Sequence, residues 1–232
     1  MQIFYTPDIA VNPELPDEEG QHAIRVLRLT EGTEILLTDG KGTFYKAAIS
    51  VANAKHCRVE IVEQWQPGNL WNFKLHLAVA PTKNMDRLEW FTEKATEIGI
   101  DAITCLNCRY SERKEVKPAR LEKILVSAMK QSQKATLPAL NGMTDFKAFV
   151  SQPFDGRKFI AHCNEGEKPL LKKIYHPGES ALILIGPEGD FSPEEVTLAI
   201  SKGFEPISLG ESRLRTETAA LVACHTIHVL NQ

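Results

Sequence analysis

The first 70 residues alternate short apolar stretches with turns, which is the pattern of a small β domain. Asp39-Gly40-Lys41-Gly42 separates two of these stretches, and Asp-Gly supplies the backbone geometry of a β-hairpin turn. A helix that starts near Asp17 interrupts the set, and we expect Ala23, Val26 and Leu27 to point into the core. The pattern predicts a small β-barrel that ends at a linker, Pro67-Gly68-Asn69. The expected strands cover residues 2–5, 34–38, 43–51 and 56–65.

After the linker the pattern changes to apolar strands that alternate with amphipathic helices. Strands are expected over residues 73–80, 102–106, 158–163, 181–185 and 206–209. Helices are expected over residues 85–98, with Gly99 as the stop signal, and over residues 118–134 and 216–230. This alternation predicts an α/β fold in which a mostly parallel sheet carries helices on both faces. Ligands of such sheets bind beyond the carboxyl ends of the strands.

One of these strand ends carries an unusual turn. The apolar stretch 181–185 leads into Gly186-Pro187-Glu188-Gly189, and a helix start follows. Ser192 fits the N-cap, Pro193 the first helical position and Glu195 the end of a capping box, so this half of the motif needs no ligand. The glycines permit a close backbone approach to a bound molecule or a positive φ angle. A ligand-binding loop and an ordinary strand-to-helix turn both explain them.

A second strand end leads from Leu209 into a stretch rich in charge and threonine, residues 210–219. A threonine here could cap the next helix, and Arg213 could pair with Glu217 across one helical turn. Arg215 is harder to explain, because a guanidinium near a helix N-terminus opposes the helix dipole unless it faces an anion. Two such loops at two strand ends indicate one shared pocket.

Composition limits the class of protein. The chain is 43% hydrophobic and 25% charged over 232 residues, which fits a globular protein with a real core. No apolar run approaches the ~18 residues of a membrane span, and the first residues lack a signal-peptide pattern, so we expect a cytoplasmic protein without a membrane partner. Five cysteines fit free thiols better than a disulfide framework. Cys105-Leu106-Asn107-Cys108 lacks the second pair that a zinc site needs, so no metal is expected.

The net charge of −3 hides an asymmetry. Residues 107–134 contain eight basic and three acidic side chains, whereas residues 1–70 contain six basic and ten acidic ones. The basic segment fits contact with a polyanion, and it equally fits a solvated helix face. Because a dinucleotide fingerprint, a P-loop and a nucleophile elbow are all missing from the sequence, a ligand held by backbone groups, such as an adenine ring, fits the loops best.

The two strand-end motifs resemble the signature of a known family. Residues 184–192, Leu-Ile-Gly-Pro-Glu-Gly-Asp-Phe-Ser, together with Leu209-Gly210 and residues 214–219, are similar to the SPOUT-class 16S rRNA uridine N3-methyltransferases, the ribosomal small subunit methyltransferase E family. Residues 93–99 resemble the E-K-x-T-E-L-G helix of that family, and Ser111-Glu112-Arg113 resembles its S-E-R. Further matches are His22 with residues 26–29, and Gln131-Ser132 with Pro138.

The resemblance implies S-adenosyl-L-methionine as the methyl donor, 16S rRNA or the 30S subunit as the partner, and a homodimer. It implies a PUA-like RNA-binding barrel over residues 1–68 and a SPOUT domain with a trefoil knot over residues 72–232, although chains rarely thread themselves. The implied cofactor-binding residues are Ala161, Cys163, Ile185, Gly186, Pro187, Glu188, Gly189, Leu209, Gly210, Leu214, Thr218 and Ala219.

Methylation of uridine at N3 requires loss of the N3 proton and alignment of the nitrogen with the methyl group. Under the resemblance, Arg215 would stabilise the developing anion, and Glu217 would accept the proton or orient that arginine. The candidate rRNA contacts are His22, Arg25, Arg28, Arg109, Arg113 and Lys117.

The chain departs from the usual family pattern at three positions. Ser212 and Lys134 stand where the family usually has arginine, and Lys130 stands where it usually has an acidic residue. Two alternatives to the proposed activity remain open. The chain could be a SPOUT methyltransferase that acts on tRNA or on another rRNA position, or a non-catalytic RNA-binding assembly protein.

Overall fold

The computed structural model describes residues 2–68 and 70–232. The chain forms two compact units, of which the first combines Met1–Leu70 with Val126–Leu137 and the second combines Trp71–Leu125 with Pro138–Gln232. Pro67 and Gly68 of the expected linker belong to no helix or strand, and Asn69 lies outside the described residues. The domain boundary expected between residues 68 and 72 stays a prediction.

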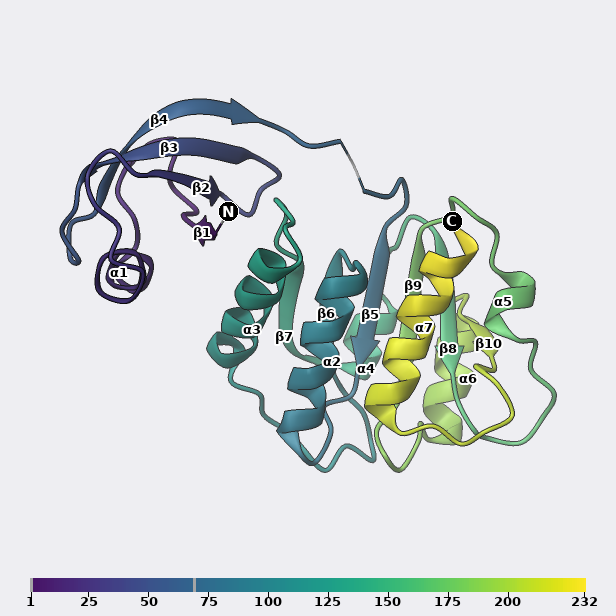
Figure 1. Ribbon diagram of the computed structural model, residues 1–232. Coiled ribbons are helices and arrows are strands. Elements are labelled where there is room, and N and C mark those ends of the chain that lie inside the picture. The colour runs from purple at the N-terminus through teal and green to yellow at the C-terminus, as the bar shows by residue number, and fades with distance from the viewer. Residues whose placement is uncertain (1, 69) are drawn as a thin grey trace. The chain divides into compact units, whose positions relative to one another are not determined.

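The first unit contains one four-stranded sheet in the order β1 (Ile3–Tyr5), β2 (Glu34–Thr38), β3 (Phe44–Val51) and β4 (Arg58–Trp65). All four expected strands are confirmed to within two residues. The hairpin between β2 and β3 is confirmed as well, because an Asp39 carboxylate oxygen accepts the backbone N–H groups of Lys41 and Thr43. The expected barrel thus takes the form of a curved sheet, visible in Figure 1.

The helix of this unit differs from the expected one. α1 (Asp17–Gln21) continues as a π-helix, η1 (His22–Val26), in which the N–H of Leu27 bonds the carbonyl of His22 five residues back. The wider π turn moves side chains off the face that a spacing of 3.6 residues per turn assigns to them. Ala23 is fully buried as expected, but the inward orientation predicted for Val26 is wrong, because its side chain is 65% exposed.

The segment Val126–Leu137 completes this unit and explains one departure from the family pattern. The Thr38 hydroxyl donates to the carbonyl of Ala135 at 3.0 Å. The Lys130 ammonium lies 2.5 Å from a carboxylate oxygen of Glu19, and both side chains are largely buried. A lysine at position 130 is therefore matched by an acidic partner on α1.

The second unit contains a six-stranded sheet in the order β10-β8-β9-β5-β6-β7, and every adjacent pair is parallel. The parallel sheet predicted from the sequence is confirmed. The strands are β5 (Leu75–Val79), β6 (Ala102–Asn107), β7 (Ala139–Asp145), β8 (Arg157–Ala161), β9 (Ala181–Ile185) and β10 (Glu205–Ile207). The helices that begin in this unit are α2 (Met85–Ile98), α3 (Pro118–Gln131), α4 (Phe146–Val150), α5 (Leu171–Ile174), α6 (Pro193–Ser201) and α7 (Thr216–Leu230).

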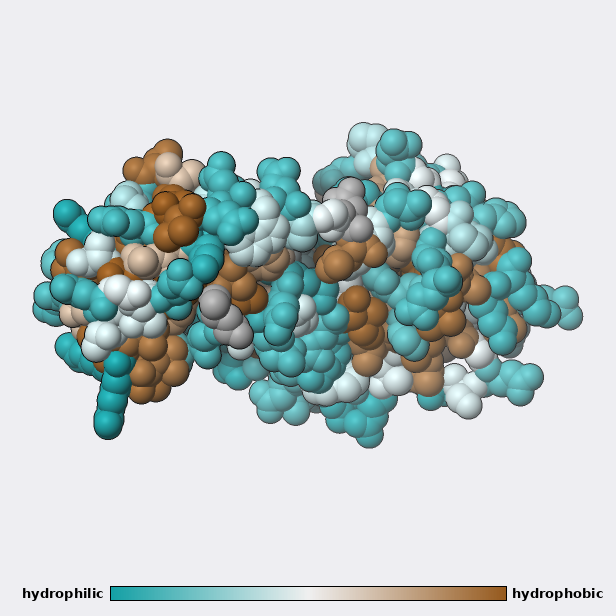
Figure 2. Space-filling model, turned by 45° about the horizontal axis from the view of Figure 1, so that its top comes forward, coloured by the Kyte–Doolittle hydropathy of each residue, from teal (hydrophilic) through white to brown (hydrophobic). Residues whose placement is uncertain are grey.

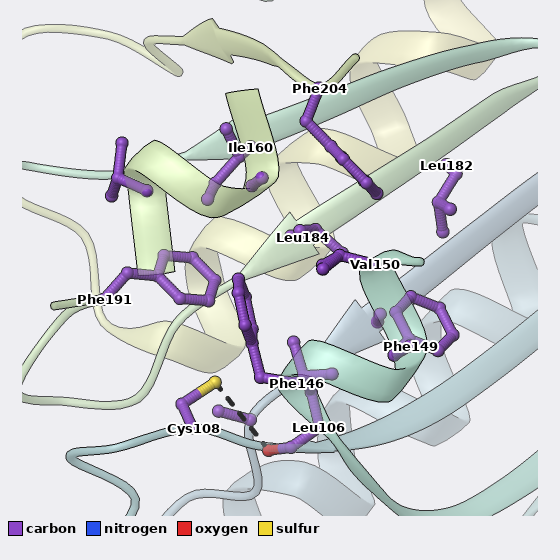
Figure 3. Packing of buried hydrophobic residues seen from close by; sticks show 14 residues of the cluster. Leu106, Cys108, Phe146, Phe149, Val150, Ile160, Leu182, Leu184, Phe191 and Phe204 are labelled. Carbon is purple, nitrogen blue, oxygen red and sulfur yellow. Dashed lines mark hydrogen bonds between the residues drawn. The ribbon is translucent and has the colours of Figure 1, made fainter. Parts of the chain in front are cut away.

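Helices cover both faces of this sheet, as expected. α2 and α7 lie side by side on one face, where α7 packs on β5 and β9, while α4 and α6 lie on the other (Figure 1). On the α4–α6 side a buried cluster packs against the strands, and Figure 3 shows Phe146 and Phe191 lying next to Leu184. The ring centroids of Phe146 and Phe191 are 5.6 Å apart. This core holds Phe191 in place, and Phe191 directly follows the turn at residues 186–190.

The carboxyl ends of four strands lie level with one another. Ala161 of β8 is in register with both Ile207 of β10 and Ile185 of β9, and Ile185 is in register with Val79 of β5. The loops that follow these strands therefore leave the sheet at one edge. After β10 the chain returns from the edge of the sheet to its centre, where α7 packs; the trefoil knot stays a prediction.

The visible face of the molecule carries mostly hydrophilic side chains with smaller hydrophobic areas between them (Figure 2). Across the described residues, no helix is long and apolar enough to cross a membrane.

Candidate functional site

The loops after β9 and β10 are joined by a direct hydrogen bond. The hydroxyl of Thr216, the first residue of α7, donates to the carbonyl oxygen of Gly186 at 3.1 Å, and Thr216 is buried. The sequence predicts one pocket from these two loops, and the bond holds their backbones together at the carboxyl edge of the sheet.

The turn after β9 is shaped by packing more than by unusual backbone angles. Neither Gly186 nor Gly189 has a positive φ; the left-handed residue of the turn is Asp190, with φ 65°. A Cβ atom on Gly186 would lie 3.1 Å from the Phe191 ring, and one on Gly189 would lie 3.1 Å from Cβ of Tyr110. A side chain at either glycine would therefore force a close neighbour to move.

The helix start that follows this turn is confirmed. Ser192 caps α6, its hydroxyl accepts the backbone N–H of Glu195, and the Glu195 side chain accepts the backbone N–H of Ser192 in return. Glu195 also accepts the backbone N–H of Arg109 at 2.8 Å. The capping box thus ties the turn to the loop after β6.

The loop after β8 is bonded to the same turn. The Asp190 carboxylate accepts the backbone N–H of Cys163 at 2.8 Å, and the Asn164 amide donates to the carbonyl of Phe191 at 3.2 Å. Of the residues expected here, Ala161 ends β8 and Cys163 is exposed. Three strand-end loops are therefore linked into one framework.

His162 stands within this framework, although the sequence did not single it out. Both ring nitrogens are sealed from solvent and have no hydrogen-bond partner among the described residues. Burial and the nearby Lys168 ammonium lower the pKa of His162, against the opposing charge of Asp190. A neutral imidazole, with one donor and one acceptor unsatisfied among the described residues, therefore lies between two expected cofactor contacts.

The loop after β10 contains Gly210, which borders open space. Gly210 has φ 144°, which favours glycine, and no heavy atom lies within 4 Å of the place where its Cβ would stand. The Ser208 hydroxyl donates to the carbonyl of Gly210 and accepts its N–H. Leu209, Leu214, Thr218 and Ala219, also expected at this site, are half-buried.

The start of α7 corrects the expected side-chain pairing. Arg215 is the N-cap residue and is exposed, and no threonine side chain caps the helix. The alternative pairing of Glu217 with Arg213 is wrong, because the Glu217 carboxylate faces Arg87 of α2 instead, with 3.8 Å between Oε1 and Nε. Only 8% of Glu217 is exposed, and its Oε2 is buried without a hydrogen-bond partner.

The loop after β5 supports the turn from the other side. The backbone N–H of Lys83 donates to a carboxylate oxygen of Glu188 at 3.0 Å. The Arg113 guanidinium donates to the carbonyls of Thr82 and Lys83 at 3.2 and 2.7 Å. Arg113, a candidate rRNA contact, therefore also holds this loop in place.

The remaining candidate rRNA contacts fall in both units. In the first unit His22 lies 3.2 Å from the Gln2 amide, and Arg25 and Arg28 are exposed. In the second unit Arg109 pairs with Glu194 at 3.2 Å, and Lys117 is exposed. Part of the basic segment therefore forms ion pairs, while other members of it are open to solvent.

Two hollows lie near these loops. One, of about 440 Å³, is lined by Lys83, Glu112, Arg113, Lys114 and Glu115. The other, of about 350 Å³, lies where β6 and β7 end, between the first turns of α4 and α6. Cys108 lines this second hollow, and both Cys105 and Cys108 are buried. Burial raises the pKa of the Cys105 thiol to about 11. Buried thiols of this kind are inert.

Sequence reasoning missed three residues of this framework: Arg87, His162 and Asp190. Asp190 follows Gly-Pro-Glu-Gly directly, and its tolerance of left-handed backbone was an available signal. Arg87 lies 130 positions from its partner, so no local pattern indicates the pair.

Comparison with known proteins agrees with this architecture. Residues 69–228 match the model of an RNA methyltransferase domain, and residues 15–62 match that of an RNA methyltransferase PUA domain. A relative from Synechocystis sp., named ribosomal RNA small subunit methyltransferase E, is 31% identical over 216 residues, which is 89% of this chain and 69% of the relative.

Solved structures agree over nearly the whole chain. A probable rRNA-methyltransferase from Porphyromonas gingivalis is 44% identical, with a TM-score of 0.95 over 100% of this chain and 98% of the other. A ribosomal RNA small subunit methyltransferase E from Neisseria gonorrhoeae, bound to S-adenosyl methionine, is 29% identical, with a TM-score of 0.87 over 99% and 98% of the two chains. The chain therefore belongs to the ribosomal small subunit methyltransferase E family of RNA methyltransferases.

Proposed function

We propose that this protein transfers a methyl group from S-adenosyl-L-methionine to N3 of a uridine in the 16S rRNA of the small ribosomal subunit. Family membership and the names of the relatives support this proposal. The observation that carries it is the hydrogen bond between Thr216 and Gly186, because it joins the two loops that carry the family motifs.

The residues at the carboxyl edge of the sheet fit S-adenosyl-L-methionine. Gly210 borders open space, so a ligand has room beside the loop after β10. The backbones of residues 185–189, 209–210 and 214–219 would hold it, next to Ala161 and Cys163 of the loop after β8. When bound, the cofactor supplies a methyl group on a positively charged sulfur.

Arg215 and Glu217 are the proposed catalytic residues. Arg215 is exposed at the N-terminus of α7, where a guanidinium gains most by facing an anion, and it would stabilise negative charge on the uracil ring as N3 loses its proton. The buried Glu217 carboxylate has an unpartnered acceptor in Oε2, so it would take the N3 proton when binding of the target base opens access to that oxygen.

The rRNA is proposed to contact both units. Arg25, Arg28 and Lys117 are exposed, and no ion pair of theirs is present in the described part of the chain, so their charge is available for phosphates. His22, Arg109 and Arg113 already make contacts within the protein, and their rRNA contacts stay predictions.

We also propose a homodimer in the cytoplasm. Trp90 on α2 and Val229 on α7 are 44% and 50% exposed, and these two helices pack against each other, so a second copy could cover their apolar surface. The free cysteines of the chain suit a reducing compartment. Sedimentation analysis at micromolar concentration tests the dimer, and a single species of 25.9 kDa would exclude it.

Methyl transfer to separate RNA substrates tests the proposed reaction. The protein is incubated with labelled S-adenosyl-L-methionine and with 30S subunits, free 16S rRNA or bulk tRNA, and the modified nucleoside is identified by mass spectrometry. We expect N3-methyluridine in 16S rRNA. Label in tRNA, or at another rRNA position, would assign a different substrate, and binding without transfer would favour an assembly protein.

A further inference from the structure

The pairing of Glu217 with Arg87 is looser than the tightest arginine–glutamate pairs of the second unit. Arg157 lies 2.6 Å from Glu205 and Arg120 lies 2.5 Å from Glu89, both within hydrogen-bonding distance. Arg87 and Glu217 are 3.8 Å apart, which is too far for a hydrogen bond. Yet Glu217 is the more buried carboxylate, since its side chain is 10% exposed, against 45% for Glu205.

A buried carboxylate needs compensation for its lost hydration. The N-terminus of α7 supplies part of it, because Glu217 lies in the first turn, where the helix dipole favours negative charge. Arg87 supplies a full positive charge from α2. Oε2 nevertheless remains sealed from solvent and without a hydrogen-bond partner. One oxygen each of Glu19 and Glu89 is also unpartnered, but those carboxylates accept a hydrogen bond from Lys130 and Arg120, whereas Glu217 accepts none from Arg87.

We infer that Arg87 is a positioning residue, which holds Oε1 of Glu217 through charge and so leaves Oε2 as the acceptor for an N–H group of the target base. This inference rests on the proposed function and adds a residue from α2 to the site. The loose contact suits the role, because a bidentate Arg–carboxylate pair would occupy both oxygens. Arg87 does not itself touch the reacting atoms.

The position of Arg87 on a rigid element supports this assignment. α2 begins directly after the loop of residues 80–84, which Arg113 and Glu188 hold from two sides. α2 also packs along α7, so a side chain from its first turn reaches the first turn of α7 at a fixed distance. The packing of α2 on α7 and the contacts of the 80–84 loop therefore set the positions of both helices independently of the Arg87–Glu217 pair.

The test uses the full-length protein with S-adenosyl-L-methionine and the RNA substrate that the wild type methylates. Arg87→Gln, Arg87→Lys, Glu217→Gln and the double variant Arg87→Gln/Glu217→Gln are compared by kcat, by KM for RNA and by calorimetric Kd for the cofactor. Arg157→Gln is the matched control, because it breaks a closer arginine–glutamate pair at the opposite end of β8. Thermal unfolding of each variant measures any general decrease in stability.

We expect Arg87→Gln to lower kcat about tenfold to a hundredfold, as misplacement of a catalytic group does, with KM and Kd changed less than about threefold. Arg87→Lys should recover most of the activity because it keeps the charge. The double variant should be no slower than Glu217→Gln, since both changes disable the same carboxylate.

Three results would overturn the inference: an unchanged kcat in Arg87→Gln, effects that multiply in the double variant, or a fall of kcat in Arg157→Gln as large as in Arg87→Gln. If Arg87→Gln does not fold, the comparison of Arg87→Lys with Glu217→Gln still tests the inference. An Arg87→Lys protein that folds but has a kcat as low as that of Glu217→Gln would contradict positioning by charge. A wild-type protein that methylates no RNA would instead refute the proposed function.

Discussion

The hydroxyl of Thr216 reaches 3.1 Å to the carbonyl oxygen of Gly186, although the two residues are 30 positions apart. Thr216 begins α7 and Gly186 directly follows β9, so the bond connects a helix start to a strand end. Because both groups are buried or nearly so, the bond is shielded from water, and each partner depends on the other for its hydrogen bond. This hydrogen bond therefore holds together the two loops that form the candidate pocket.

Removing the hydrogen bond between Thr216 and Gly186 should lower both the stability of the protein and its affinity for the cofactor. Thr216→Val keeps the shape of the side chain but leaves the Gly186 carbonyl without its donor, so we expect the free energy of unfolding to fall by about 1–3 kcal/mol. Urea unfolding and calorimetry with S-adenosyl-L-methionine measure the two effects, and Thr216→Ser should restore most of both. Thr197→Val is the control, because the Thr197 hydroxyl bonds a carbonyl of its own helix at the exposed surface. Equal decreases in the two valine variants would contradict the prediction.

Gly186→Ala should disturb the same turn by overpacking. The new Cβ would stand 3.1 Å from the Phe191 ring and 3.2 Å from its backbone nitrogen, so either the ring or the turn must move. We expect a decrease of about 1–3 kcal/mol in unfolding free energy and a weaker affinity for the cofactor. Gly142→Ala serves as the control because no heavy atom lies within 4 Å of that Cβ. A Gly186→Ala protein as stable as the wild type would show that the turn adapts freely.

The sequence predicts the fold best where the hydrophobic period is long. The helices at residues 85–98 and 216–230 and the strand at 181–185 agree residue for residue with α2, α7 and β9. β7, which spans Ala139–Asp145, was missed because polar residues and a glycine interrupt its apolar positions. Val26 was placed wrongly because a π turn has no signature in a pattern of period 3.6.

The candidate site was predictable only in its loops. The motifs at Gly186 and Leu209 identify two strand ends, and parallel strands bring such ends to one edge. The partner of Glu217 was not predictable, since Arg213 satisfies the helical spacing while Arg87 meets Glu217 only through the packing of α2 on α7. His162 was missed because only the fold determines that its ring nitrogens meet no partner among the described residues.

Arg215→Ala should separate chemistry from cofactor binding. Arg215 is exposed at the N-cap of α7 and makes no side-chain cap bond, so its removal should leave the fold and the cofactor loops intact. We expect methyl transfer to fall by about 10²-fold or more, with the calorimetric Kd for S-adenosyl-L-methionine changed little. A parallel decrease in cofactor affinity would remove Arg215 from the catalytic role and place it in the cofactor pocket.

Charge reversal of the exposed basic residues should weaken RNA binding and flatten its salt dependence. In a variant that combines Arg25→Glu, Arg28→Glu and Lys117→Glu, each phosphate that is no longer neutralised lowers the slope of log K against log salt by about 0.7–0.9. Filter binding of 16S rRNA between about 50 and 300 mM salt measures the slope. Lys172→Glu, a reversal at another exposed position, is the control. An unchanged slope in the combined variant would exclude these three side chains as phosphate ligands.

His76 should make the protein less stable in mild acid. It lies on β5, where burial lowers its pKa to about 4, and its Nε2 is 2.7 Å from the Thr104 hydroxyl. Because Thr104 accepts a hydrogen bond from the Asn141 amide, its own hydrogen can bond a neutral imidazole, and protonation of the ring would break that arrangement.

The sign of the effect follows from the two pKa values. An unfolded His76 takes up its proton near pH 6.5 and the folded one only near pH 4, so the unfolded chain binds more protons between these values and acidification favours unfolding. The contribution is present in full above pH 6.5 and is lost as the pH falls toward 4, by up to about 3 kcal/mol. Urea unfolding from about pH 7.5 to about pH 4 should show a shallower decline in His76→Gln than in the wild type. The same slope in both proteins, or an equal change in the exposed control His56→Gln, would show that other groups cause the decline.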